Sequence, residues 1–287
     1  MSGLQIMYSK EVAKELTKIA VCLPGAPVEV GQIIHFPFGR SGVWPFRKSA
    51  PQGAFNLITT LQNLGINPQE TGPDEDGDPY IFASRKSVKI DANFDATGTL
   101  TPGVNANGQL NASFEAEGSV YFAAIDCKTN SISNLDQIGV DLEKHTNSLI
   151  WDETFLVTSV TIASKALIMQ SSTKSAVLTV QVDIKGLVTK NVSDINANAQ
   201  IGVKNFKESS FIKPWSDNVT IFIGLHRFTK ENFGLQPSTI VHRLSAFESI
   251  EVAKIASGLI NSPNDKYRLE PVSAFEILDE DDLKTLE

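Results

Sequence analysis

The sequence predicts an α+β protein in which long antiparallel β-hairpins are combined with short helices. In the segment 88–122 every even-numbered residue is apolar or small, and nearly every odd-numbered residue is polar. A second alternating region covers 176–203, where the apolar residues change from even to odd positions. A period of two places alternate side chains on opposite faces of a strand. Both regions are longer than a usual strand of about five or six residues.

The first third of the chain contains two predicted helices and one predicted strand. Residues 8–18 have a capping serine and apolar residues four apart, which predicts a helix. The apolar segment 19–25 then predicts a buried strand that ends at a Pro-Gly turn. Residues 53–64 fit a second helix, which stops at Gly65. The stretch 67–79 is rich in acidic residues, Gly and Pro, and therefore predicts a solvated turn region.

The rest of the chain supplies further strands and helices. Residues 133–147 predict a helix, and residues 153–164 and 218–228 predict strands of the central sheet. Capping boxes that begin at Ser245 and Ser273 predict two helix starts near the C-terminus.

Each alternating region can fold into a hairpin with a short turn. Cross-strand partners lie on the same face, so 88–122 needs a turn with an odd number of residues, such as 102–104. The change of parity in 176–203 requires an even number, near 190–193. Each arm then has about the 9–11 residues that a membrane-crossing strand needs. An antiparallel sandwich with one wet face also alternates, but it predicts shorter runs and larger core residues. The residues that would face lipid are Val88, Ile90, Phe94, Leu100, Val104, Leu110, Phe114, Val120, Leu178, Val180, Val182, Ile184, Ile195, Ile201 and Val203.

Composition indicates a folded chain without membrane-spanning helices. The 287 residues are 41% hydrophobic and 20% charged, and no stretch approaches about 18 consecutive apolar residues. The net charge of −8 argues against a nucleic-acid partner. The N-terminus has no basic start followed by an apolar run, and Cys22 and Cys127 do not make a disulfide framework. We therefore expect a cytoplasmic protein.

The acidic residues are concentrated near the C-terminus. From Leu244 onward ten acidic residues face four basic ones, a net charge of −6, which leaves −2 for the first 243 residues. Acidic C-termini are often simply solvated. If this segment were removed, however, the remaining body would be less strongly repelled by anionic lipid.

The order of elements in 152–228 resembles the pore-forming domain of gasdermins. A strand around LVTSV is followed by an alternating arm, a polar turn, a second alternating arm and a final strand, TIFIGLHRF. The segment KIAVCLPGAPVEVGQII is similar to the first strand after the N-terminal helix of that family. The resemblance covers most of 8–228 and is closest to the short bacterial type, which lacks the large C-terminal domain of animal members.

This resemblance implies a twisted antiparallel sheet flanked by short helices, with a short helical and acidic C-terminal tail that inhibits the protein. Residues 1–243 would form the pore-forming domain, and 244–287 the autoinhibitory segment with a polar joint at 261–271. After proteolysis, a homo-oligomer would insert the hairpins 88–122 and 176–203 and permeabilise a membrane. Such a protein acts in cell death and antiviral defence, and moves from cytoplasm to membrane on activation.

The resemblance also suggests where the tail is cut and held. Asp265 would suit a caspase-like protease, whereas Lys266 and Arg268 would suit a trypsin-like one. Burial of Phe275 and Ile277 would anchor the tail. Many bacterial members carry a lipidated cysteine within the first few residues, which this chain lacks; Cys22 is expected to be a buried thiol rather than an acylated one.

No motif in the sequence indicates an enzyme or a cofactor. The four histidines have no metal-ligand spacing with each other or with the cysteines, and no nucleophile elbow, P-loop or dinucleotide-binding motif is present. We therefore expect no catalytic residues, no metal and no cofactor. The alternative function is a structural or assembly protein, whose long hairpins pair with neighbouring subunits.

Overall fold

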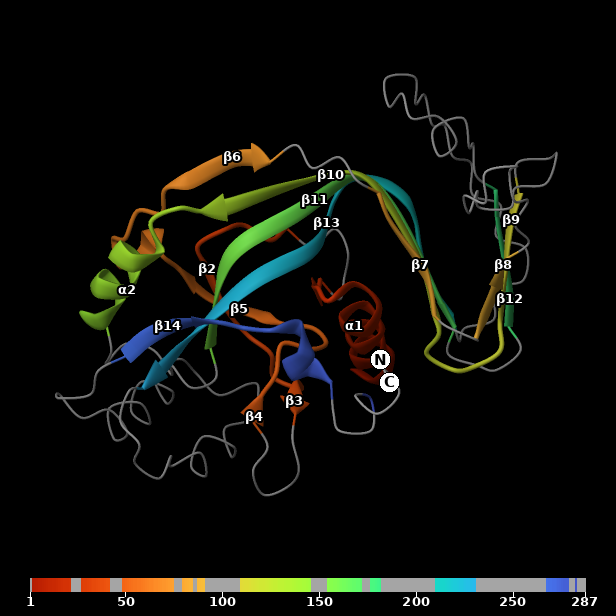
Figure 1. Cartoon of the computed structure of the whole chain (residues 1–287), viewed down its shortest axis with the longest axis horizontal. Coiled ribbons are helices and arrows are strands. Elements are labelled where there is room, and N and C mark those ends of the chain that lie inside the picture. The colour runs from red at the N-terminus through yellow and green to blue at the C-terminus, as the bar shows by residue number, and fades with distance from the viewer. Residues whose placement is uncertain are drawn as a thin grey trace.

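The structure is a computed structural model that describes residues 2–21, 27–41, 48–74, 79–84, 87–90, 109–145, 154–171, 176–181, 210–230, 267–278 and 282. This part of the chain forms a large twisted antiparallel sheet, a smaller three-stranded sheet and two α-helices (Figure 1), which is the predicted α+β class. The helices are α1 (Ser2–Leu16) and α2 (Leu135–Glu143), with 3-10 helices η1 (Gln62–Leu64) and η6 (Ala274–Ile277). The main sheet contains β1 (Ile19–Ala20), β2 (Gln32–His35), β5 (Asn56–Thr60), β6 (Glu70–Asp74), β7 (Tyr80–Ala83), β10 (Val120–Ile132), β11 (Thr154–Ser171), β13 (Ser210–Lys230) and β14 (Tyr267–Pro271). The small sheet contains β8 (Val88–Ile90), β9 (Gln109–Phe114) and β12 (Ala176–Gln181), and a separate pair is formed by β3 (Arg40–Ser41) and β4 (Lys48–Ser49).

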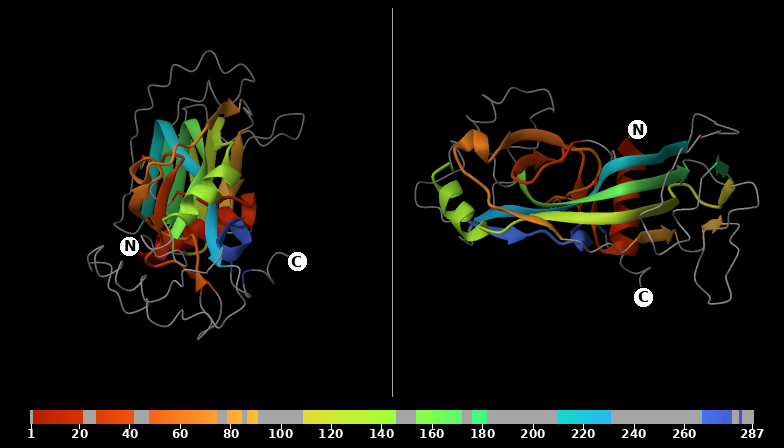
Figure 2. Two further views of the ribbon diagram at one scale, coloured as in Figure 1. Left: turned by 90° about the vertical axis from the view of Figure 1, so that its left-hand side faces the viewer. Right: turned by 90° about the horizontal axis from the view of Figure 1, so that it is seen from above.

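Three long strands form the centre of the main sheet. β11 lies between β10 and β13, and both pairs are antiparallel. β6 and β7 extend the sheet beyond β10, whereas β1 and β14 pair with β13. Figure 2 shows α2 at one end of the long strands, the small sheet at the other end, and α1 between them.

The edge strand β6 has features that disfavour pairing with another chain. It is exposed along its whole length and contains Pro73 together with Glu70 and Asp74. Proline removes a backbone donor, and charged side chains are common at protected sheet edges.

The three long strands share a bend, which Figure 1 shows about midway along them. Asp126 of β10 and Asn218 of β13 have positive φ angles of 49° and 51°. The pairing of β10 with β11 skips Asp126 and Ser164, and the pairing of β11 with β13 skips Ser164 and Asn218. The three residues therefore lie on one line across the sheet, at which both ladders are interrupted. Asp and Asn adopt the left-handed backbone more readily than other non-glycine residues, which explains their presence on this line.

Asn218→Val is expected to lower the free energy of unfolding by about 1–2 kcal/mol, because a β-branched residue is strained at positive φ. Asn218 is exposed, so the substitution removes little packing. Asn218→Gly is the matched control and should stay within about 0.5 kcal/mol of the wild type, since glycine accepts this backbone freely. Urea denaturation of the three proteins makes the comparison. Equal losses in both variants would contradict a role for the left-handed backbone.

The small sheet brings the predicted hairpin arms together in the expected parity. β8 pairs with β9 so that Val88 lies opposite Phe114, and β9 pairs with β12 so that Ala112 lies opposite Leu178. Even-numbered residues are paired with even-numbered residues in both cases, and cross-strand partners share a face. The apolar positions of all three strands therefore belong to one face, as a turn with an odd number of residues in 88–122 requires. Ala112 and Phe114 are fully buried.

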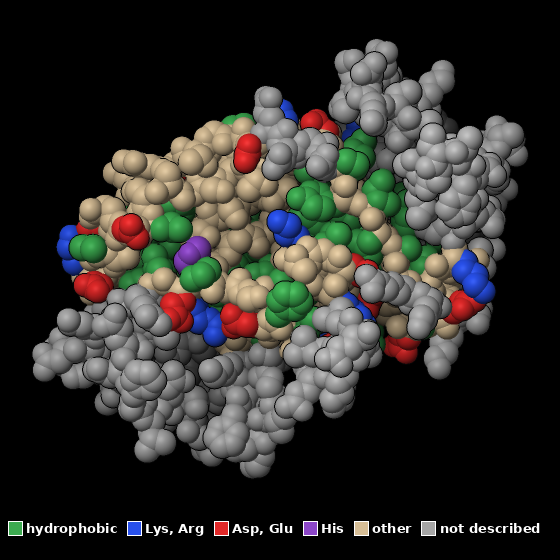
Figure 3. Space-filling model, viewed as in Figure 1, with side chains coloured by type: hydrophobic (Ala, Val, Ile, Leu, Met, Phe, Trp, Pro, Cys, Tyr) green, Lys and Arg blue, Asp and Glu red, His purple; other side chains and the backbone are tan. Residues whose placement is uncertain are grey.

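α1 packs against one face of the main sheet, and residues of β10 and β13 are buried in this contact. Val12 of α1 is fully buried in a cluster with Val120 of β10. In the same cluster the ring of Phe122 stacks between Phe82 and Phe222, at centroid distances of 5.5 and 5.6 Å. Figure 3 shows further hydrophobic side chains gathered over the bent part of the long strands. Val120, predicted to face lipid, is thus a core residue in this state.

Two predicted segments of the first third differ from the structure. The helix predicted over 53–64 is wrong, because Asn56–Thr60 is strand β5, which pairs with β2 and precedes the short helix η1. Residues 58–60 are all β-branched and favour an extended backbone, and β2 supplies the hydrogen-bonding partner. Part of the predicted turn region 67–79 is likewise strand β6, paired with β10.

The other described predictions of secondary structure are confirmed with different ends. The first helix begins at Ser2 rather than at residue 8, and the helix predicted at 133–147 is α2. β11 continues to Ser171, and β13 begins at Ser210, both beyond the predicted limits. Of the strand predicted at 19–25, Ile19–Ala20 is β1; the rest of it beyond Val21 and the helix predicted from Ser245 lie outside the described residues.

Candidate functional site

Residues 267–278, called here the docked segment, lie along the edge of the main sheet. β14 pairs with the last five residues of β13, from Pro271 opposite His226 to Tyr267 opposite Lys230. The backbone N–H of Val272 continues this contact by donating to the carbonyl of Leu225 at 2.9 Å. The expected polar joint is therefore a paired strand from Tyr267 onward.

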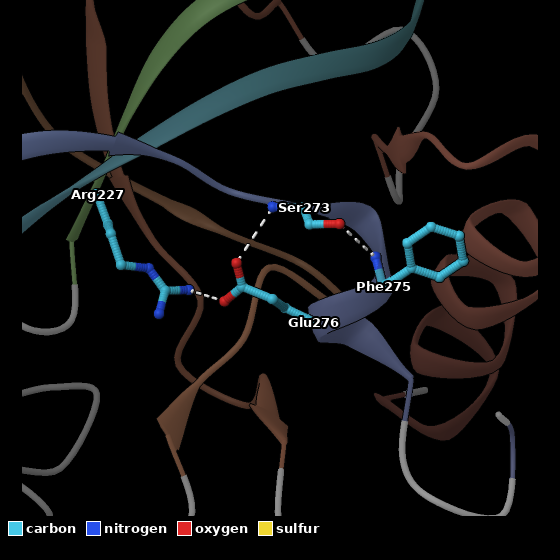
Figure 4. Close-up of polar contacts among 4 residues, drawn as sticks. All are labelled: Arg227, Ser273, Phe275 and Glu276. Carbon is cyan, nitrogen blue, oxygen red and sulfur yellow. Dashed lines mark hydrogen bonds and ion pairs between the residues drawn. The ribbon is translucent and has the colours of Figure 1, made fainter.

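A capping box turns the chain after β14 and begins η6. The Ser273 hydroxyl accepts a hydrogen bond from the Phe275 N–H at 3.2 Å, and Glu276 Oε1 accepts one from the Ser273 N–H at 3.1 Å (Figure 4). Both contacts satisfy backbone donors at the start of the helix. The capping box predicted from the sequence is therefore present, and it marks where η6 begins.

The two predicted tail anchors behave differently. Ile277 is 1% exposed and Ala274 is 6% exposed, because a spacing of three places them on the same side of a 3-10 helix. Phe275 points away from that side and is 46% exposed, so it does not anchor the segment by burial. The buried residues of the docked segment join a core cluster with α1, β1, β2, β11 and β13. They are Val272, Ala274, Ile277 and Leu278, and their partners include Ala13, Ile19, Ile34, Phe155 and Ile223.

Charged side chains fasten the C-terminal segment at two further places. Arg227 Nη2 of β13 lies 2.6 Å from Glu276 Oε2, and the Arg227 guanidinium lies 5.5 Å from the centre of the Phe155 ring. Lys10 Nζ of α1 lies 2.7 Å from Asp282 Oδ2. The four charged side chains are between 23% and 37% exposed, so each ion pair contributes only about 0–1 kcal/mol. Burial of apolar side chains therefore supplies most of the docking energy.

Arg227 and Lys10 were not predicted from the sequence. Neither belongs to a motif, and the partners of both lie more than forty positions away in the chain. No local pattern could have indicated these contacts.

The cleavage candidates lie at or just before β14. Arg268 belongs to β14, where its backbone pairs with Thr229. Asp265 and Lys266 lie outside the described residues.

Seven of the residues predicted to face lipid are within the described ranges. Val88 and Ile90 lie on β8, Leu110 and Phe114 on β9, Val120 on β10, and Leu178 and Val180 on β12. On the polar side of this sheet, Lys89 forms an ion pair with Glu115. The other eight lie outside the described residues: Phe94, Leu100, Val104, Val182, Ile184, Ile195, Ile201 and Val203.

Two half-buried titratable groups have shifted pKa values: His226 of β13 and Glu11 of α1. Burial lowers the pKa of His226, whose Nδ1 is 3.0 Å from the Thr158 hydroxyl. His226 also lines a small pocket with Leu269 of β14. Burial raises the pKa of Glu11, against the opposing effect of its hydrogen bond from Ser84. Each shift means that the charged form is disfavoured in the folded protein.

These two groups have opposite effects on stability as the pH falls. A histidine whose pKa is lower when folded loses stability below its unfolded value, near 6.5. A carboxyl whose pKa is raised instead gains stability as the pH falls through its folded pKa. We expect urea denaturation at pH 7.5 and pH 5.5 to show a loss of stability on acidification that His226→Gln reduces. An unchanged loss in His226→Gln would contradict this assignment.

The described ranges hold no helix that is long and apolar enough to cross a membrane. Within the same part of the chain, no group of three or more His, Cys, Asp or Glu is arranged to hold a metal ion. Cys127 is a buried free thiol, and burial raises its pKa to about 12, which leaves it protonated and unreactive at neutral pH. Cys22 lies outside the described residues.

No protein-family model matches the chain, and no curated protein matches its sequence. Among the solved structures that are similar to it are two gasdermin structures. One is a bacterial gasdermin from Bradyrhizobium tropiciagri, with 15% identity over 78% of this chain and 86% of the other, and a TM-score of 0.30. The second is the gasdermin A3 membrane pore, with 8% identity over 85% of this chain and 98% of the other, and a TM-score of 0.31. Both of these structures belong to the gasdermins, the family that the sequence resembles.

Proposed function

We propose that the protein is an autoinhibited pore-forming protein, which inserts two β-hairpins per protomer into a membrane after its C-terminal segment is removed. The observation that supports this most directly is the shared apolar face of β8, β9 and β12, on which even-numbered residues oppose each other across both pairs. A membrane-crossing strand needs one apolar face and a paired backbone along its length. The sequence resemblance to gasdermins supports the same function.

The register of β8 and β9 suits a single long hairpin. Val88 lies opposite Phe114 and Ile90 opposite Ala112. If this register continues in the inserted state, the turn is centred on Thr101, and each arm has about thirteen residues. That exceeds the ~9–11 residues that a tilted strand needs to cross the hydrocarbon layer.

The docked segment is the proposed inhibitor. It completes a core cluster with α1 and the main sheet, so it must leave before these elements can rearrange. A cut after Lys266 would also remove residues 267–287, which carry −5 of the net charge of −8, and would favour contact with anionic lipid. A proteolytic cut at Asp265 or Lys266 would fall just before the paired strand β14, whereas a cut at Arg268 would first require β14 to detach. The resting protein would be cytoplasmic and the active homo-oligomer would lie in the membrane.

Dye release from liposomes tests this function. Residues 261–266 are replaced by the recognition sequence of a site-specific protease, and release is measured before and after cutting. We expect no release from the intact protein and release after the cut, on vesicles that contain anionic lipid. A variant with a scrambled recognition sequence, treated with the same protease, is the control. If the cut protein releases no dye from neutral or anionic vesicles, the pore is excluded, and the assembly protein with intersubunit hairpin pairing becomes the better hypothesis.

A further inference from the structure

We infer that α1 transmits the state of the C-terminal segment to the hairpins, because one of its faces holds the roots of both hairpins while another holds the C-terminal segment. This inference rests on the proposed function. The hairpin roots are defined as Ser84 and residues 115–119 at the base of the first hairpin, and Gln170 with Ser171 at the base of the second.

The root of the first hairpin is tied to α1 through a serine hydroxyl. Ser84 lies between β7 and β8, and its backbone N–H donates to the Val120 carbonyl at 2.9 Å. The Ser84 hydroxyl accepts a hydrogen bond from the Val120 N–H at 2.8 Å and donates one to Glu11 of α1. One hydroxyl therefore joins both strands at the base of the hairpin to the helix.

The root of the second hairpin is tied to the first turn of α1. Gln170 is 2% exposed, and its Nε2 donates to the Leu4 carbonyl at 3.0 Å and to the Gly118 carbonyl at 3.2 Å. The Gly118 N–H donates to the Ser171 carbonyl at 2.7 Å. The two roots are thus bonded to each other as well as to the helix.

Gly118, at the root of the first hairpin, lies in close contact with α1. Gly118 has a φ of 81°, and a Cβ at this position would lie 2.7 Å from Met7 Sδ. Leu4, Met7 and Glu11 follow each other at spacings of three and four, so they lie on one face of α1. This face, called here the root face, contacts the roots of both hairpins.

Another side of α1, at Lys10 and Ala13, meets the C-terminal segment. Lys10 pairs with Asp282 at 2.7 Å, and Ala13 is buried in the cluster that contains Val272 and Ile277. The main contacts of β14 and η6 within the described ranges are with α1, α2, β3 and β13. The segment can therefore restrain the hairpins through α1, which it holds in place against their roots.

Hydrogen–deuterium exchange of the protein with the inserted cut site tests this coupling without a membrane. After cutting and removal of the C-terminal segment, we expect exchange to rise together in α1, at Ser84 and in 115–119. A rise in α1 with unchanged roots would overturn the inference. So would a rise in the roots with an unchanged α1. Failure of the cut protein to release dye would instead contradict the proposed pore, so the two results are distinguishable.

Gln170→Ala tests the root face in the intact protein. The loss of two buried hydrogen bonds should raise exchange at both roots by about tenfold or more, while residues 267–278 keep wild-type protection. Thr129→Val is the matched control, since it removes a hydroxyl hydrogen bond to Thr161 of 2.9 Å within the same sheet but away from α1. Equal effects of both variants at the roots would indicate general destabilisation and overturn the inference. Ser84→Ala is the second variant if Gln170→Ala does not fold, and is expected to act on the first root in the same way.

Discussion

Ile277→Ala in the intact protein is expected to release dye from liposomes without proteolysis. Ile277 is 1% exposed and packs in the cluster that also contains Phe155 and Ile223. Truncation of a fully buried isoleucine costs about 2–5 kcal/mol, because contacts are lost and a cavity is left. A loss of this size on docking would raise the population of the undocked state by more than about tenfold. The measurement is the rate of dye release from anionic vesicles by uncut protein.

Phe275→Ala is the matched control for this prediction. Phe275 lies two residues away in the same short helix and carries a larger side chain, but it is 46% exposed. Its truncation should therefore leave the intact protein dormant. Activation by both variants would mean that any change in η6 releases the segment, and dormancy of both would contradict a docked inhibitor. Limited proteolysis near residues 261–266 should follow the same order, with faster cleavage only in Ile277→Ala.

The contrast between Phe275 and Ile277 shows how much of the contact between the docked segment and the sheet could be predicted from sequence. The capping box at Ser273 fixed the start of a helical turn, and its local signature was sufficient to find it. Which of Phe275 and Ile277 is buried depends on the direction from which η6 meets the sheet. That direction is set by β14, whose pairing with β13 is a contact between distant parts of the chain. Hydrophobicity alone therefore selected both residues, and only one of them is buried.

The central strands were predictable from their apolar residues. β11 and β13 show clear apolar runs, so their existence followed from the pattern, although their ends did not. β14 was missed, because YRLEP has no alternation and includes a proline, and it forms a strand only by pairing with β13. β5, predicted to be part of a helix, likewise forms a strand by pairing with β2, and its apolar residue Leu57 is 55% exposed.

The contacts of α1 with the hairpin roots could not be predicted from the sequence. Gln170 donates to two backbone carbonyls, and the Ser84 hydroxyl bonds to a backbone N–H as well as to Glu11. Backbone partners are present at every residue, so no residue type in the sequence marks them. Only the register of the long strands, which places both roots beside the first turns of α1, identifies these side chains.

Leu178→Asp is expected to abolish dye release by the cut protein. Leu178 lies opposite Ala112 in the pairing of β12 with β9, and both belong to the apolar set of even-numbered residues. A carboxylate that faces the hydrocarbon costs about 1–3 kcal/mol, depending on its depth. A ring of identical protomers repeats this cost once per subunit, so a modest penalty for each hairpin becomes prohibitive for the assembled pore. Val180→Asp should act in the same way, because Val180 lies opposite Leu110.

Thr179→Asp separates the effect of the face from the effect of the charge. Thr179 lies between the two apolar positions and opposite Asn111, so it belongs to the polar face of the same strand. The control adds the same charge and the same low β-propensity as Leu178→Asp, and differs only in the face that carries them. Release should therefore persist in Thr179→Asp and disappear in Leu178→Asp, with circular dichroism showing that both resting proteins are folded. Loss of release in both variants would mean that β12 tolerates no charge at all. Persistence in both would mean that this face never meets lipid, and the pore would then have to be built from another part of the chain.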